Sequence, residues 1–271
     1  MNFTKKLLTA SRKNKSLLCV GLDPDPVLMP NVDVVEFGRQ IIEATKDLVC
    51  AYKPNFAFYE ALGVDGLAKL DQTLRYIPVN IPIIADAKRG DIGNTARKYA
   101  HAIFDIFGFD AATVNPYMGL DSIQPFTDYE NKGTLILCHT SNTSAADFQK
   151  LQCQADSVPC VYPLFELVAM KAAEWNARQN IGLVIGATNP NPLKRIREIC
   201  PNMPLLIPGI GAQRGNLASA IRNGIDINGE KAIITSSRQI IYASKSKDFP
   251  SAARLEASKL RTRINQFLAR K

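Results

Sequence analysis

The chain has 271 residues, of which 46% are hydrophobic and 21% charged, a composition typical of a globular protein that buries a substantial core. Its net charge of +8 could indicate a nucleic-acid partner, but the basic residues are scattered, and a positive field suits a small anionic substrate equally well. Because the basic residues are scattered, we expect no nucleic-acid partner. The sequence contains neither the ~18 consecutive apolar residues of a membrane span nor the apolar core of a signal peptide, so we also expect no membrane partner.

Short apolar runs alternate with longer amphipathic stretches along the whole chain. An N-terminal helix over about 3–13 precedes the first run. The runs predict buried β-strands over 17–22, 49–54, 81–88, 111–116, 134–139, 181–186, 204–208 and 231–236. The amphipathic stretches predict helices over 34–48, 58–76, 95–107, 120–129, 163–178, 192–199, 217–223 and 252–268. The least regular segments are 142–159 and 243–250.

Eight successive strand–helix units indicate an α/β protein with a parallel sheet and right-handed crossovers. They favour a closed (β/α)8 TIM barrel with an extra N-terminal helix over an open doubly wound sheet, since such barrels often use about 250 residues. No linker, low-complexity tract or shift in composition divides the sequence. We therefore expect residues 1–271 to form a single domain.

Polar residues gather where the predicted strands end, which is where a barrel of this kind carries its chemistry. Taken alone, each has a structural alternative: Lys53 could be a surface lysine, and Asp23 a turn former before Pro24. The side chains at six strand ends nevertheless converge on one face of the barrel, and this convergence favours an active site. The residues are Asp23, Lys53, Asn55, Asp86, Lys88, Asp91, Thr140, Ser141, Gln213 and Arg238.

The most informative segment begins in the third predicted strand, directly after its apolar stretch 81–85, and reads DAKRGDIGNT from residue 86 to 95. Side chains alternate along a strand, so Asp86 and Lys88 are expected to point the same way, with Asp91 in the glycine-containing turn beyond. A core strand has no packing reason to end in three charges. The alternative is a solvated strand end with an ordinary ion pair.

The ends of the seventh and eighth strands suggest a phosphate site. Glycines at 209, 211 and 215 expose backbone N–H groups, and Arg238 can donate two hydrogen bonds to a phosphate. The alternative is that these glycines only permit tight turns. Gln213 and Arg238 on adjacent strands favour the phosphate site, which is a common use of this corner of the barrel.

The cysteines point to a reducing compartment and not to a metal. None of the six forms a CxxC pair and only two histidines are present, so we expect no zinc site. Cys19 and Cys138 lie in apolar runs, where cysteine acts as a small buried hydrophobe. We expect a cytoplasmic protein.

These segments together resemble orotidine 5'-phosphate decarboxylases. The resemblance runs from about residue 21 to residue 238 and includes the family's D-x-K-x-x-D motif as Asp86, Lys88 and Asp91. The segments KRGDIGNT (88–95) and PGIGAQ (208–213) are similar to the longer-chain subgroup of that family. The resemblance implies a (β/α)8 barrel, conversion of orotidine 5'-monophosphate to UMP and CO2 as the last step of de novo pyrimidine synthesis, and no metal or organic cofactor.

The resemblance also implies a role for each matching residue. Lys88 would protonate C6 of the pyrimidine, Asp86 would face the substrate carboxylate, and Lys53 would bind the ribose and orient Asp86. Of the remaining residues, Asp23 would hold a ribose hydroxyl, Ser141 with Thr140 would contact the pyrimidine, and Gln213 and Arg238 would bind the phosphate. Asn55 would be a further substrate-binding residue. Asp91, Ile92 and Thr95 would reach into the neighbouring subunit, so that a homodimer shares its active sites.

Two other functions remain open at this point. A magnesium-dependent sugar-phosphate lyase of the same superfamily shares the D-x-K-x-x-D motif, but it carries a metal-binding carboxylate where Lys53 stands. A non-catalytic barrel that binds a phosphorylated ligand is the second alternative, since a fold alone does not define an activity. An orotate phosphoribosyltransferase chain is a possible partner.

Overall fold

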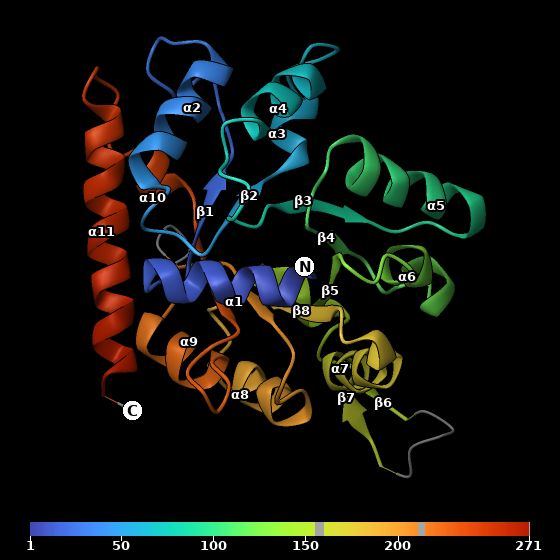
Figure 1. Cartoon of the computed structure of the whole chain (residues 1–271). Coiled ribbons are helices and arrows are strands. Elements are labelled where there is room, and N and C mark those ends of the chain that lie inside the picture. The colour runs from blue at the N-terminus through green and yellow to red at the C-terminus, as the bar shows by residue number, and fades with distance from the viewer. Residues whose placement is uncertain (155–159, 211–214, 271) are drawn as a thin grey trace.

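Eight parallel strands form a closed ring at the centre of the molecule (Figure 1). The computed structural model describes residues 1–154, 160–210 and 215–270. The strands pair in the order β2-β1-β10-β9-β8-β5-β4-β3, and bridges between Tyr52 and Ile83 and between Asn55 and Asp86 join β2 to β3. The fold is therefore the predicted TIM barrel. Its strands are β1 (Leu18–Leu22), β2 (Ala51–Pro54), β3 (Ile84–Arg89), β4 (Ala111–Val114), β5 (Gly133–His139), β8 (Ile181–Ile185), β9 (Leu205–Ile207) and β10 (Ala232–Ser236).

Helices surround this ring and alternate with the strands in sequence. They are α1 (Phe3–Asn14), α2 (Val34–Thr45), α3 (Phe56–Glu60), α4 (Gly66–Leu74), α5 (Gly93–His101), α6 (Leu120–Thr127), α7 (Leu164–Trp175), α8 (Pro190–Ile199), α9 (Leu217–Gly224), α10 (Arg238–Ile241) and α11 (Phe249–Leu268). Within the described residues, no helix combines the length and apolarity that a bilayer crossing requires.

Three local predictions differ from the structure. The helix predicted over 58–76 is two helices, α3 and α4, because Gly63 has a φ of 78° and interrupts the helical hydrogen bonds. The helix predicted over 95–107 changes into a π-helical turn at Ala102–Ile106. The short helix α10 and the antiparallel hairpin of β6 (Gln152–Cys153) and β7 (Tyr162–Pro163) were not predicted.

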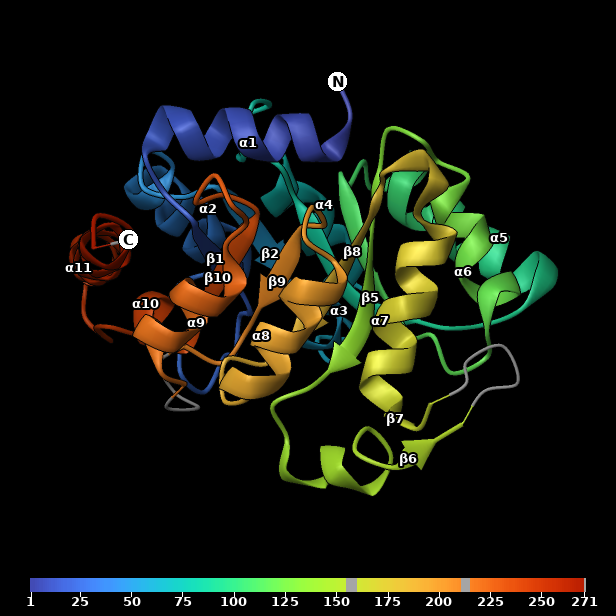
Figure 2. The ribbon, with the colours of Figure 1, turned by 90° about the horizontal axis from the view of Figure 1, so that it is seen from below.

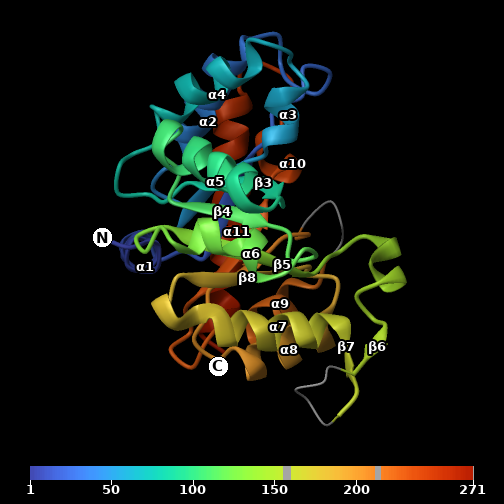
Figure 3. The same ribbon diagram turned by 90° about the vertical axis from the view of Figure 1, so that its right-hand side faces the viewer.

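The N-terminal helix closes one end of the barrel. Phe3 and Leu7 of α1 are each 3% exposed and pack with the apolar side chains that fill the barrel interior. A Cβ atom at Gly133 would lie 2.4 Å from the Phe3 ring, so the start of β5 needs glycine to admit that ring. Figures 2 and 3 show α1 on the opposite side of the molecule from the β6–β7 hairpin, so the other end of the barrel is left for the site.

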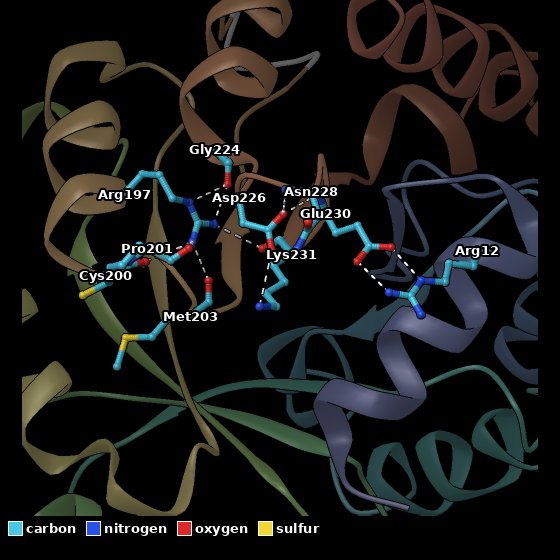
Figure 4. Close-up of polar contacts among 10 residues, drawn as sticks. All are labelled: Arg12, Arg197, Cys200, Pro201, Met203, Gly224, Asp226, Asn228, Glu230 and Lys231. Carbon is cyan, nitrogen blue, oxygen red and sulfur yellow. Dashed lines mark hydrogen bonds and ion pairs between the residues drawn. The ribbon is translucent and has the colours of Figure 1, made fainter. Parts of the chain in front are cut away.

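Ion pairs and backbone hydrogen bonds fix this closed end (Figure 4). Arg12 of α1 donates to both carboxylate oxygens of Glu230, at 2.7 and 2.9 Å. Glu230 lies in a turn before β10 that is held by Asp226, whose Oδ1 accepts the backbone N–H groups of Asn228 and Glu230 at 2.9 Å. The turn therefore ties α1 to the strand end beneath it.

Arg197 of α8 also stabilises this closed end of the barrel, through hydrogen bonds to backbone carbonyl groups. Its guanidinium donates to the carbonyl oxygens of Cys200, Met203 and Gly224 at 2.5–3.1 Å (Figure 4). Burial lowers the pKa of Arg197 to about 10, despite the nearby charge of Asp226. One side chain thus provides hydrogen-bond donors for backbone carbonyl groups that lie outside the barrel strands.

Candidate active site

A cavity of about 270 Å³ opens where the strands end, on the side of the barrel away from α1. Five of the residues proposed from the sequence line it: Asp23, Lys53, Asn55, Asp86 and Arg238. They come from β1, β2, β3 and β10, so the convergence expected from the strand ends is present. The other lining residues are Phe58, Pro208, Gly209, Ile210, Thr235, Ser236, Ser237 and Gln239.

The carboxylate of Asp86 is bonded to two lysines. Lys53 Nζ lies 2.5 Å from Asp86 Oδ2, and Lys88 Nζ lies 2.5 Å from Asp86 Oδ1. The side chain of Lys53 is 5% exposed and that of Asp86 is 12%, whereas that of Lys88 is 50% exposed. Lys88 does not line the cavity itself, but it contacts Asp86, which does. One lysine is therefore a fixed buried charge, and the other is accessible.

Electrostatics keep Asp86 and Lys53 ionised at neutral pH. Burial alone would raise the pKa of Asp86, but the charges of Lys53 and Lys88 outweigh it and lower that pKa to about 2. Burial likewise opposes the charge of Lys53, yet Asp86 and Asp23 raise the pKa of Lys53 above its ordinary value. The cavity thus holds a carboxylate and a buried ammonium group in their charged forms.

Asp86 and Lys88 meet, but not through the regular alternation expected from the sequence. The pairing of β3 with β4 shifts between Ala85 and Arg89, and Lys88 has a φ of 46°. A non-glycine residue in this left-handed region is uncommon and marks a constrained backbone. The strand therefore bulges at its end, and the bulge turns Lys88 Nζ back onto Asp86.

Asp91 does not join this cluster within its own chain. Its Oδ1 accepts the N–H of Ile92 at 2.8 Å, and it makes no ion pair with any described residue. Asp91, Ile92 and Thr95 lie outside the cavity, and the Ile92 side chain is 54% exposed. Within one chain, Asp86 and Lys88 are therefore in contact, and Asp91 is not part of their ion-pair cluster.

Asp23 brings an unpaired oxygen to the cavity wall. The residue is 8% exposed, and its Oδ1 has no hydrogen-bond partner among the described residues. The hydroxyl of Ser236, beside it in the wall, has none either. Buried polar atoms are normally satisfied, so these two suit a ligand that carries hydroxyl groups.

The cavity also contains groups suited to an anion. Arg238 is the first residue of α10, is exposed, and forms no ion pair with a described residue. It lines the cavity together with Pro208, Gly209 and Ile210 after β9. Gln213 lies outside the described residues.

Thr140 and Ser141 follow β5 but do not line the cavity. The hydroxyl of Thr140 donates to Asn142 Oδ1 at 2.6 Å and accepts from Gln149 Nε2 at 2.8 Å. In this structure the Thr140 hydroxyl therefore stabilises its own loop. To contact a ligand, it would have to give up a hydrogen bond to Asn142 or Gln149.

Several residues of the site were missed by the sequence analysis. Phe58 lines the cavity from α3, where its helical position resembles that of any packed aromatic residue. Ser236 and Ser237 belonged to a recognised strand end, which was the available signal for them. Among the described residues, no group of three or more His, Cys, Asp and Glu side chains is placed to hold a metal ion.

Comparison with known proteins identifies the family. The model of the orotidine 5'-phosphate decarboxylase / HUMPS family matches residues 16–249. The chain belongs to this family. Within the decarboxylase family, a relative named orotidine 5'-phosphate decarboxylase from Dehalococcoides mccartyi is 51% identical over 271 residues, which are 100% of both chains.

Solved structures agree with this assignment. The structure of Leishmania donovani OMP decarboxylase superposes with a TM-score of 0.86 at 38% identity, covering 99% of each chain. Leishmania donovani UMP synthase superposes with a TM-score of 0.89 at 39% identity, and the match covers 99% of this chain and 57% of that longer one. The decarboxylase resemblance found in the sequence is thus confirmed over nearly the whole chain.

Proposed function

We propose that this chain converts orotidine 5'-monophosphate to UMP and CO2, the last step of de novo pyrimidine synthesis, with Lys88 as the proton donor. The observation that carries the proposal is Asp86, held between a buried and an accessible lysine at the edge of a cavity whose wall also contains Arg238. Full-length relatives named orotidine 5'-phosphate decarboxylase support it.

Substrate binding follows from the chemistry of the cavity wall. Arg238 binds the phosphate through charge-assisted hydrogen bonds, with Gln213 as a further phosphate contact. Asp23, Lys53 and Asn55 bind the ribose, since Asp23 offers an unpaired carboxylate oxygen to a hydroxyl donor. Thr140 and Ser141 contact the pyrimidine. Binding energy from the phosphate, far from the reacting carbon, can then be used in the transition state.

The chemical step requires a prepositioned cation. Loss of CO2 breaks the C6–carboxylate bond and leaves its electron pair on C6, with no carbonyl or imine group to delocalise it. The Lys88 ammonium stabilises this charge and transfers one proton to C6, giving UMP, and solvent then returns a proton to the lysine. Asp86 faces the substrate carboxylate, so the repulsion between them is relieved as CO2 leaves. Lys53 keeps Asp86 ionised and in place.

The lysines also distinguish this reaction from the alternatives. A magnesium-dependent sugar-phosphate lyase of the superfamily has a carboxylate at the position of Lys53, which here is a buried cation. A non-catalytic phosphate-binding barrel has no need of an accessible lysine bonded to a buried carboxylate. We therefore propose catalysis without a metal or an organic cofactor.

The test is a spectrophotometric assay of orotidine 5'-monophosphate loss, with and without EDTA. We expect the wild-type rate to be the same in both. Activity that disappears with EDTA and returns with magnesium would contradict metal independence, and absence of decarboxylation in both would contradict the function itself.

The proposal includes a homodimer with shared active sites. Asp91, Ile92 and Thr95 lie outside the cavity of their own chain: Asp91 and Ile92 are on the connection from β3 to α5, and Thr95 is in the first turn of α5. This connection extends outward from the barrel (Figure 1). Tyr117, 84% exposed, gives the neighbouring β4–α6 connection an apolar surface. A second copy of the chain covers this surface and receives Asp91 near its own Lys88.

Two further parts of the proposal concern the cell. The six cysteines are free, which fits a reducing compartment, and we propose the cytoplasm. An orotate phosphoribosyltransferase chain remains a predicted partner, because it supplies the substrate of this reaction. Co-purification of the two chains tests this prediction.

A further inference from the structure

We propose that Thr113 of β4 is a positioning residue that holds the backbone of Lys88 in its catalytic geometry. The inference rests on the proposed function, because it assigns a task to a side chain outside the substrate cavity. Thr113 is 1% exposed and does not line that cavity. It acts through the backbone of the neighbouring strand.

The pairing of β3 with β4 shows why a support is needed. Ala85 pairs with Ala112 and Arg89 pairs with Val114, so one residue of β4, Thr113, lies opposite three residues of β3. A bulge of this kind removes the regular ladder partners of the extra residues. N–H groups left without a partner away from solvent destabilise a structure, and those of Ala87 and Lys88 are partly buried, so the bulge requires an acceptor from elsewhere.

The Thr113 hydroxyl is that acceptor. Its Oγ1 accepts the N–H of Ala87 at 3.0 Å and the N–H of Lys88 at 2.9 Å. The single hydroxyl proton is directed toward the Ala85 carbonyl oxygen and Asp86 Oδ1, each 3.4 Å away. One side chain therefore contacts every residue of the bulge, including the carboxylate that binds both lysines.

These contacts fix the part of Lys88 that matters for proton transfer. With a φ of 46°, Lys88 needs external support to keep this conformation. That conformation directs its Nζ to Asp86 Oδ1, 2.5 Å away. Without the hydroxyl, β3 can relax toward regular pairing, which moves Nζ away from Asp86 Oδ1. The phosphate and ribose contacts come from other strands and remain in place.

Thr134 offers a comparison for Thr113, because it pairs with Ala112, the residue before Thr113 in β4. Thr134 is in the next strand, β5, is 0% exposed, and its hydroxyl has no partner among the described residues. Thr113 and Thr134 thus have the same side chain and similar burial on adjacent strands. They differ in whether the hydroxyl is used, and they form a matched pair of positions for an experiment.

The experiment compares Thr113→Val with Thr134→Val, since valine keeps the shape of threonine and removes the hydroxyl. We expect kcat for Thr113→Val to fall by about 10²-fold, the effect of displacing a catalytic group by ~1 Å, while UMP binds as it does to wild type. Thr134→Val should retain the kcat of wild type. Hydrogen exchange at the Ala87 and Lys88 amides should be faster in Thr113→Val alone.

An unchanged kcat in Thr113→Val, or an equal loss in both valine variants, overturns the positioning role. Absence of decarboxylation by the wild type contradicts the proposed function instead, and the hydrogen-exchange comparison still tests Thr113. If Thr113→Val does not fold, Thr113→Ser and Thr113→Cys replace it. Serine keeps the oxygen acceptor and should retain most of the kcat, whereas the weakly accepting thiol should not. Equal rates in these two variants overturn the proposal.

Discussion

The charge of Asp86 keeps two lysines ordered at the cavity. Each of its carboxylate oxygens is bonded to a different ammonium group, so a neutral side chain at this position leaves Lys53 buried with less compensation. Removing one partner of a buried ion pair generally destabilises a protein more than the pair itself stabilises it. The consequences concern both stability and its dependence on pH.

We expect Asp86→Asn to lower the free energy of unfolding by about 3 kcal/mol at neutral pH. The pKa of Asp86 is lowered from 3.8 to about 2, so its contribution is fully present above pH 4 and is lost as the pH falls toward 2. The difference between wild type and variant should therefore shrink over that range. Urea unfolding at pH 6 and pH 3 measures it.

The control is Asp71→Asn, which breaks an exposed pair between Asp71 of α4 and Arg75 at its C-terminal end and should cost less than about 1 kcal/mol. A difference between wild type and Asp86→Asn that stays constant from pH 6 to pH 3 would show that the charge of Asp86 does not support the fold.

Arg238 is expected to act on the phosphate alone. We predict that Arg238→Ala lowers kcat/KM for orotidine 5'-monophosphate by ~10²-fold or more, because a charge-assisted contact is lost. With orotidine, which lacks the phosphate, wild type and variant should have the same low rate. The exposed arginine variant Arg75→Ala serves as control and should match wild type with both substrates. An unchanged rate with the phosphorylated substrate would remove Arg238 from the phosphate site.

The residues found by sequence analysis were those whose chemistry is unusual for their position. A charged run after a buried strand made Asp86 and Lys88 conspicuous, and both proved to be in contact. Thr113 gave no such signal, because a threonine in a buried strand is ordinary. Its task depends on a bulge in the neighbouring strand, and the sequence pattern does not encode which residues a bulge leaves unpaired.

Helices and strands were predicted well where the spacing of apolar residues and the length of the segment were clear. All eight barrel strands were found because buried parallel strands appear as short continuous apolar runs. The interruption between α3 and α4 was missed, since the amphipathic pattern continues across Gly63 and only the φ of that residue marks the break. The two-residue strands β6 and β7 are too short for any periodicity to be detected.

The N-terminal helix should contribute to stability through its first turns. Phe3→Ala removes an aromatic ring from the closed end of the barrel, and we expect the free energy of unfolding to fall by about 3–5 kcal/mol. Phe148→Ala, at a side chain that is 62% exposed, is the matched control and should change it by about 0.5 kcal/mol or less. Similar losses in the two variants would mean that α1 does not close the barrel in solution.

At the scale of the whole molecule, the eight strands of the ring enclose a common core. We propose that residues 1–271 unfold as a single domain, because each strand depends on both neighbours to bury its side chains. The fluorescence of the only tryptophan, Trp175, and the far-UV circular dichroism should then follow the same denaturation curve. Two separate transitions would indicate more than one unit.

The barrel could be predicted from the number and order of its units, whereas the assembly could not. A closed ring follows from eight alternating strands and helices under simple rules of connection. Whether a second chain completes the site depends on surface residues such as Ile92, which have no periodic pattern. Only the family resemblance suggested that Asp91 belongs to the partner's site, and that suggestion needs a direct test.

Dimers mixed from two inactive variants test whether Asp91 acts in the partner's site. We expect Lys88→Ala and Asp91→Ala each to be nearly inactive alone. If Asp91 serves the partner's site, a hybrid dimer contains one site with both defects and one with neither. Random mixing at equal concentrations makes half of the dimers hybrids with one intact site each, so activity should recover to about one quarter of wild type.

The control mixes Lys88→Ala with Asp86→Asn, whose changed residues are bonded to each other within one chain. Each site of that hybrid carries one defect, and no activity should return. Subunit exchange is verified by mass spectrometry of differently tagged chains. If exchange is complete and the Lys88→Ala and Asp91→Ala mixture remains as inactive as this control, Asp91 acts in its own subunit. The sites are then not shared, whatever the oligomeric state of the protein.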